Sequence, residues 1–125
     1  MRLLLDTHIL LWAALDDARL PAGIREVLTA PGTELHVSAA SVWEVAIKRS
    51  IGKLSVPDDL FDTVRAEGVV PLAITWAHAR AAGRLPRHHA DPFDRMLIAQ
   101  SRLEGLRLAS ADAQISLYDV DLLSG

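Results

Sequence analysis

The stretch RLLLDTHILLW, residues 2–12, decides the fold that this sequence predicts. Leu3, Leu4 and Leu5 form a wholly apolar run that ends at Asp6. Such a run is typical of a strand that is buried on both faces of a parallel sheet. Residues 9–15 continue with helical spacing. We therefore expect a strand that ends in a carboxylate and leads directly into a helix.

Short apolar runs and longer helical patterns alternate along the rest of the chain. Further strands are predicted at residues 35–37, 69–72 and 106–110, and helices at residues 21–30, 38–51, 58–67, 75–83 and 91–104. This alternation predicts an α/β fold with a central parallel sheet and helices on its faces. Ligands of such sheets bind beyond the carboxyl ends of the strands, which is where Asp6 and Asp112 fall.

The composition limits the possible functions. The 125 residues, of which 50% are hydrophobic, suit a single domain over residues 1–125. There is no cysteine, which excludes disulfides and thiolate chemistry, and we expect a cytoplasmic protein. No stretch approaches the roughly 20 apolar residues that span a bilayer. A net charge of −3 gives no global attraction to nucleic acid, so such a role would need a local site.

Four acids are candidates for a shared site: Asp6, Glu44, Asp94 and Asp112. Two like charges about 4 Å apart repel by roughly 4 kcal/mol at an effective dielectric of about 20. Converging acids must therefore be protonated, paired with a base or bound to a cation. Oxygen ligands favour a hard ion such as Mg²⁺ or Mn²⁺, which can activate water for attack on a phosphodiester.

Glu44 and Asp112 also have purely structural interpretations. Glu44 follows Ser41 by three residues, which is the spacing of a capping box. If the helix begins earlier, at Ser38, Glu44 lies deeper in it and needs another explanation. Asp112 suits an ordinary turn.

Asp91 and Asp94 raise the same choice between helix capping and chemistry. Asp91 precedes Pro92, the typical pairing of an N-cap with a proline at the first helical position. Asp94 would favour the helix dipole, yet its neighbour Phe93 indicates that this end of the helix faces the interior. Asp6 is harder to explain structurally, because a buried ionised acid is costly unless it is paired or bound to metal.

Histidines and aromatic residues complete the candidates. His88 and His89 with Asp91 suggest a transition-metal site, although a polar loop ahead of a helix is an ordinary place for histidine. The large aromatic side chains are expected mostly in the core, with some at an interface with another protein chain: Trp12, Trp43, Trp76 and Tyr118.

Four motifs in order resemble the PIN domain, in particular the VapC-type toxins of bacterial toxin–antitoxin pairs: LLLDTHILLW, SAASVWEVAIK, HADPFDRMLIAQ and LASAD. The resemblance covers nearly the whole chain and implies a PIN-like α/β/α sandwich with a central parallel sheet. Two positions depart mildly from the family pattern. Ser110 stands where threonine is frequent, and Met96 where leucine is more usual.

The resemblance implies an endoribonuclease that holds one or two Mg²⁺ or Mn²⁺ ions. Asp6 and Asp94 would anchor the principal ion, while Glu44 and Asp112 complete its shell directly or through water. Asp91 lies in a family motif and would orient the site or contact metal through water. A metal-activated water would then hydrolyse the phosphodiester bond of transfer, ribosomal or messenger RNA. The implied partners are a cognate VapB-like antitoxin and a second copy of the chain. No association with a membrane is expected.

Nearby basic side chains are candidates for holding the substrate backbone, or are simply solvated helix and loop ends: Lys48, Arg49, Arg84, Arg87 and Arg95.

Two rival functions stay open. Another Mg²⁺-dependent phosphoryl-transfer domain would place a paired acid or a phosphoacceptor after a strand, and ELHVSA and GVVPLA end without an aspartate. A non-catalytic PIN-like binding module would be expected to lose acids, whereas all four positions are filled.

Overall fold

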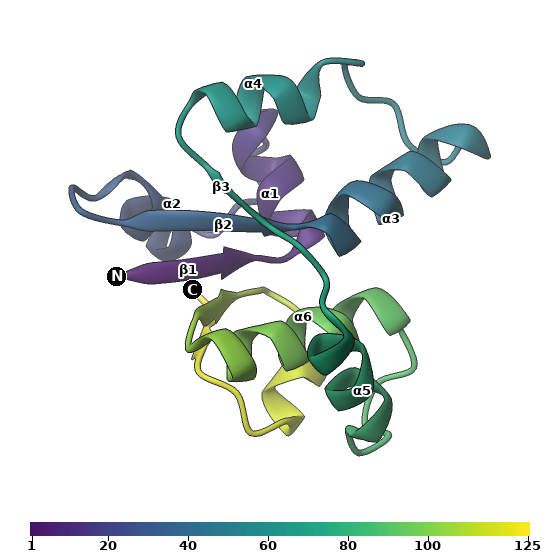
Figure 1. The fold of residues 1–125 in the computed structure, drawn as a ribbon. Coiled ribbons are helices and arrows are strands. Elements are labelled where there is room, and N and C mark those ends of the chain that lie inside the picture. Colours follow the sequence, from purple (N-terminus) through teal and green to yellow (C-terminus); the bar gives the residue numbers. More distant parts are fainter.

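The computed structural model describes residues 1–125 and contains one five-stranded sheet, in which every pairing is parallel (Figure 1). The strand order is β3-β2-β1-β4-β5. The strands are β1 (Arg2–Leu5), β2 (Glu34–Ser38), β3 (Val70–Leu72), β4 (Arg107–Ala109) and β5 (Leu122–Leu123). The α/β fold with a central parallel sheet, predicted from the sequence, is confirmed.

The first strand occupies the centre of the sheet. Leu3 pairs with Leu35 of β2 on one side and with Arg107 of β4 on the other. Leu3, Leu4 and Leu5 are 0%, 0% and 2% exposed. Leu3 and Leu5 belong to one hydrophobic cluster and Leu4 to the other. The strand is therefore buried on both faces, as its apolar run predicts.

Helices form a layer on each face of the sheet. The helices are α1 (Thr7–Ala14), α2 (Ala22–Thr29), α3 (Ala39–Ser50), α4 (Leu60–Ala66), α5 (Trp76–Arg84) and α6 (Pro92–Glu104). Side chains of α1, α2 and α4 pack in the cluster of Leu3 and Leu5, whereas α6 packs in that of Leu4 (Figure 1). None of the helices is long and apolar enough to cross a bilayer. The sheet is thus enclosed in an α/β/α sandwich.

The end of the chain contains two elements that the sequence pattern did not predict. A 3-10 helix, η1 (Ala113–Leu117), follows β4, and β5 then adds to the sheet edge beside β4. Strand β5 is two residues long and only partly buried, so it leaves no apolar run for a pattern to detect. Its position depends on pairing with β4, which is a tertiary contact.

The expectation that the large aromatics lie mostly in the core is wrong for two of them. Tyr118 is 6% exposed, and Trp12 is partly buried against the core. Trp43 and Trp76 are 62% and 90% exposed. Helix α3 buries the face that carries Glu44 and the neighbouring Val45, which turns Trp43 outward to rest edge-on against Phe93.

The central strand yields a prediction about stability. Leu4→Ala removes a fully buried side chain between β2 and β4, so it should lower the free energy of unfolding by about 2–5 kcal/mol. Urea denaturation of the full chain measures this loss. Leu103→Ala is the control, because Leu103 is 53% exposed, and should cost less than about 1 kcal/mol. Equal losses in the two variants would contradict the assignment of β1 as the core strand.

Candidate metal and catalytic site

Asp6 links the central strand to the first helix and is almost completely buried. It is 3% exposed, and its Oδ1 accepts a hydrogen bond of 2.8 Å from the backbone N–H of Ile9 in α1. Burial raises the pKa of the Asp6 carboxyl, against the lowering effect of hydrogen bonds from Ser110 and Ile9. The charge of Asp112 raises it further. Asp6 is therefore both a helix cap and an acid close to another acid.

Asp91 and Asp94 have different surroundings at the start of α6. Asp91 caps the helix: its Oδ1 accepts from the backbone N–H groups of Phe93 at 2.8 Å and Asp94 at 3.3 Å. Burial, followed by the charges of Asp91 and Asp6, raises the pKa of Asp94 to about 6. The capping prediction for Asp91 is confirmed. Asp94 instead projects toward the acid at the end of β1.

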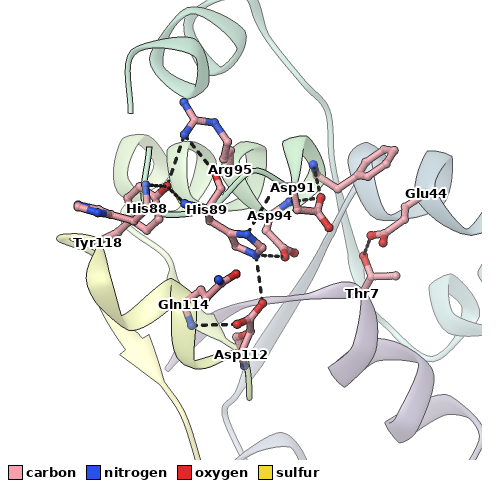
Figure 2. A network of polar contacts seen from close by, with 12 residues as sticks. Thr7, Glu44, His88, His89, Asp91, Asp94, Arg95, Asp112, Gln114 and Tyr118 are labelled. Atoms are coloured by element: carbon pink, nitrogen blue, oxygen red, sulfur yellow. Dashed lines mark hydrogen bonds and ion pairs between the residues drawn. The ribbon is translucent and has the colours of Figure 1, made fainter. Parts of the chain in front are cut away.

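Asp112 and Asp94 meet at the side chain of His89 (Figure 2). The Nε2 atom of His89 lies 2.8 Å from Oδ2 of Asp94 and 3.1 Å from Oδ2 of Asp112. The other Asp112 oxygen, Oδ1, accepts from the backbone N–H of Gln114 at 2.9 Å and so caps η1. One ligand atom from each of His89, Asp94 and Asp112 lies within 4.8 Å of the others. These three residues could hold a divalent ion. Their carboxylate oxygens suit Mg²⁺ or Mn²⁺, whereas an imidazole nitrogen is a ligand that transition metals such as Zn²⁺ and Fe²⁺ favour.

The position of Glu44 decides between its two sequence interpretations. Helix α3 begins earlier than the capping box requires, because Ser38 is its N-cap and accepts from the backbone N–H of Ala40 at 3.0 Å. The capping box of Ser41 with Glu44 is therefore wrong. Glu44 lies inside the helix and is 3% exposed, which leaves its burial in need of another explanation.

Two partners hold the buried carboxylate of Glu44. The Thr7 hydroxyl donates to its Oε1 at 2.7 Å, and Lys48 donates to its Oε2 at 2.7 Å (Figure 2 draws the Thr7 bond). Thr7 immediately follows Asp6, so this pair places Glu44 beside the end of β1. Glu44 stands outside the compact set formed by His89, Asp94 and Asp112. The structure thus brings Asp94 and Asp112 together at His89. Asp6 also lies outside this compact set, but it is near enough for its charge to raise the pKa of Asp94.

The basic residues that were candidates for substrate contact have different environments. Lys48 is paired with Glu44, and Arg49 with Asp58. Arg84 and Arg87 are exposed, and their guanidinium groups make no hydrogen bond or ion pair with the protein. These last two therefore keep free guanidinium groups near the loop that leads to α6.

Arg95 is occupied by the protein backbone. Its Nη1 donates to the carbonyl of Pro86 at 2.9 Å, and its Nη2 to the carbonyls of Ala82 at 2.9 Å and Leu85 at 3.0 Å. The Tyr118 hydroxyl donates to the same Pro86 carbonyl at 2.7 Å. Arg95 and Tyr118 therefore fasten the loop between α5 and α6, a role that the sequence did not reveal.

A hollow of the surface lies apart from the acids. It has a volume of about 540 Å³ and lies between α5, α6 and η1, with Arg84, Arg102 and Tyr118 in its walls. None of the acids gathered at the end of β1 lines it. The acid cluster is the stronger candidate for chemistry, because perturbed carboxylates beyond the strand ends of a parallel sheet are typical of a functional site.

Known proteins share the fold of this chain. The family model of the PIN domain matches residues 3–121, while no curated protein matches significantly. Three solved structures share the fold. DNA-bound VapBC from Salmonella typhimurium is 15% identical with a TM-score of 0.71, and covers 98% of this chain and 97% of its own. VapBC2 from Rickettsia felis, bound to a promoter DNA fragment, is 13% identical with a TM-score of 0.70 and covers 98% of each chain. VapC20 from Mycobacterium tuberculosis, a sarcin-ricin loop cleaving toxin, is 18% identical with a TM-score of 0.66 and also covers 98% of each.

The raised pKa of Asp94 predicts how stability depends on pH without added metal. Above pH 6 the folded protein bears the cost of an ionised, crowded Asp94, and this cost disappears as the pH falls from about 6 to the ordinary value of 3.8. Asp94→Asn should therefore stabilise the protein at pH 7.5 in EDTA, by on the order of 2 kcal/mol, with little effect at pH 4. Thermal and urea unfolding at both pH values measure this. The exposed control Asp119→Asn should match wild type, and a destabilising effect of Asp94→Asn at pH 7.5 would contradict the crowding of acids.

The loop anchor gives a second prediction. Arg95→Lys cannot span three backbone carbonyls, since an ammonium group lacks the planar fork of a guanidinium. The variant should lose about 1–3 kcal/mol in urea unfolding. Arg102→Lys, on the exposed face of the same helix, should change stability by less than about 0.5 kcal/mol. A loss for Arg95→Lys no larger than that of the control would show that the anchor contributes nothing.

Proposed function

We propose a function from the finding that this chain belongs to the PIN domain family. Residues 1–125 would form one PIN domain that acts as a metal-dependent endoribonuclease. The observation that carries the proposal is the meeting of Asp94 and Asp112 at His89, with the buried Asp6 at the end of β1 near enough for its charge to act on Asp94. The pKa values of Asp6 and Asp94 are raised, and a divalent cation beside them would offset the cost of their negative charge.

The four acids have different proposed roles in binding the ion. Asp6 and Asp94 are its proposed anchors, and Asp112 and Glu44 complete the shell directly or through water. The donor set of carboxylate oxygens fits Mg²⁺ or Mn²⁺. When bound, such an ion supplies an activated water molecule and positive charge beside the phosphate.

The protein's own residues prepare the site for this role. Lys48 and the Thr7 hydroxyl keep both oxygens of Glu44 in fixed positions. The backbone N–H of Ile9 fixes one Asp6 oxygen. Preformed orientation reduces the cost of ordering side chains when a ligand binds. The exposed guanidinium groups of Arg84 and Arg87 are available to contact an RNA backbone, which supplies much of the affinity of proteins for nucleic acid.

The structural neighbours suggest a biological setting for this chain. Two of them are VapBC complexes, and VapC20 is a toxin that cleaves the sarcin-ricin loop. By extension, we assign this chain the role of a cytoplasmic toxin with RNA as its substrate, whether transfer, ribosomal or messenger RNA. Its partners would be a cognate VapB-like antitoxin and a second copy in a homodimer. The exposed Trp43 and Trp76 offer aromatic surface of the kind enriched at such interfaces.

Cleavage of RNA tests the proposed function. The purified chain, freed of any copurified antitoxin, is incubated with mixed transfer and ribosomal RNA in Mg²⁺, Mn²⁺ or EDTA. Cutting should require the metal and fall by at least about 100-fold in Asp6→Asn and in Asp94→Asn, because each removes a charged ligand from the ion. Asp119→Asn, an exposed acid outside the cluster, should cut like wild type.

Thermal unfolding of each variant separates lost chemistry from lost fold. If folded wild type cuts no more RNA than the variants do, the nuclease assignment fails for these RNAs. A non-catalytic PIN-like binding module would then account better for the chain. Cutting that persists in EDTA would instead contradict the metal dependence.

A further inference from the structure

His89 reaches both Asp94 and Asp112 with a single ring nitrogen. Its Nε2 lies 2.8 Å from one carboxylate and 3.1 Å from the other, and the side chain is 12% exposed. These two acids come from separate segments, α6 and the turn after β4. The imidazole is therefore the one side chain that hydrogen-bonds to both.

The second ring nitrogen indicates which nitrogen carries the proton. The backbone N–H of Asp91 points at Nδ1 of His89 at 3.5 Å, so Nδ1 is the acceptor. In a neutral imidazole the proton then resides on Nε2, which makes Nε2 a donor shared between Asp94 and Asp112. A nitrogen that donates a proton has no lone pair free for a metal, so this geometry favours orientation of the acids over direct ligation.

The loop that carries His89 is fastened on its backbone. The N–H groups of His88 and His89 both donate to the Tyr118 hydroxyl, at 3.1 and 2.9 Å. Nη1 of Arg95 lies 3.4 Å from the His89 carbonyl oxygen. Residues on either side of the imidazole are thus fixed to α6 and to the segment after η1. A donor held in this way can impose one orientation on the carboxylates that it contacts.

We propose that His89 is a positioning residue of the cation site: its Nε2–H holds Oδ2 of Asp94 and Oδ2 of Asp112, which leaves for the ion Oδ1 of Asp94 and the second lone pair of the Asp112 Oδ1 that caps η1. The inference rests on the proposed function, since it assumes that these acids bind a divalent ion. Partners that orient metal-binding groups typically contribute about 10- to 100-fold to metal affinity. Because His89 does not touch the ion, its removal weakens Mg²⁺ and Mn²⁺ alike.

Metal affinity tests this role without RNA. Isothermal titration of the full chain with Mg²⁺ and with Mn²⁺ compares wild type, His89→Leu, His89→Gln and the neighbouring control His88→Leu. His89→Leu should weaken both ions about 10- to 100-fold and by similar factors. His89→Gln retains an N–H donor and should recover most of the affinity, and His88→Leu should match wild type.

The protonation of the ring gives a second readout. In ¹⁵N-labelled protein, long-range ¹H–¹⁵N spectra should show the Nε2–H form of His89, assigned by its loss in His89→Gln, and this form should persist when Mg²⁺ saturates the site. Transfer of the proton to Nδ1 on Mg²⁺ addition, or a selective loss of Mn²⁺ affinity in His89→Leu, would identify a direct ligand and overturn the inference. Unchanged affinities in His89→Leu would overturn it as well, with the nuclease assignment left standing. If wild type binds neither ion, the proposed function and this inference fall together.

Discussion

A carboxylate buried at the end of the central strand is the constraint on which the rest of the site depends. Strand β1 pairs on both sides and is covered on both faces, so Asp6 ends the strand with little access to water. The charge of Asp112 raises the pKa of Asp6, and the charge of Asp6 raises the pKa of Asp94. Such a group of acids is stable only if hydrogen bonds, bases or a cation offset their repulsion. The fold places neutralising groups around the cluster and leaves its centre suited to a cation.

The compensating groups explain several features that look unrelated along the chain. Lys48 and Thr7 hold Glu44, whereas His89 spans Asp94 and Asp112. The loop that carries His89 is itself held by other residues, Arg95 and Tyr118. Arg95, which directly follows Asp94, therefore supports the candidate site by holding the backbone of the neighbouring loop.

Local signals predicted much of the fold and part of the site. The apolar run from Leu3 to Leu5 predicts a buried strand, and the structure has β1 there. The pair of Asp91 and Pro92 predicts a capped helix, and the structure has α6 there. The capping box of Glu44 was wrong because Ser38 and Ser41 both suit an N-cap, and only packing decides between them. The bridge made by His89 and the anchor made by Arg95 depend on the path of a loop. The spacing of residues in the sequence does not predict the conformation of that loop. It does not predict the short pairing of β5 with β4 either.

The most direct test of this account is the position of the ion itself. Crystals of the full chain soaked in Mn²⁺ and measured at the manganese absorption edge would give an anomalous difference peak. The account predicts a peak among the carboxylates of Asp6, Asp94 and Asp112, with His89 beside the cluster but outside the ion's ligand shell. A well-occupied peak elsewhere, or no peak with these acids free of lattice contacts, would contradict the claim that their convergence creates a metal site.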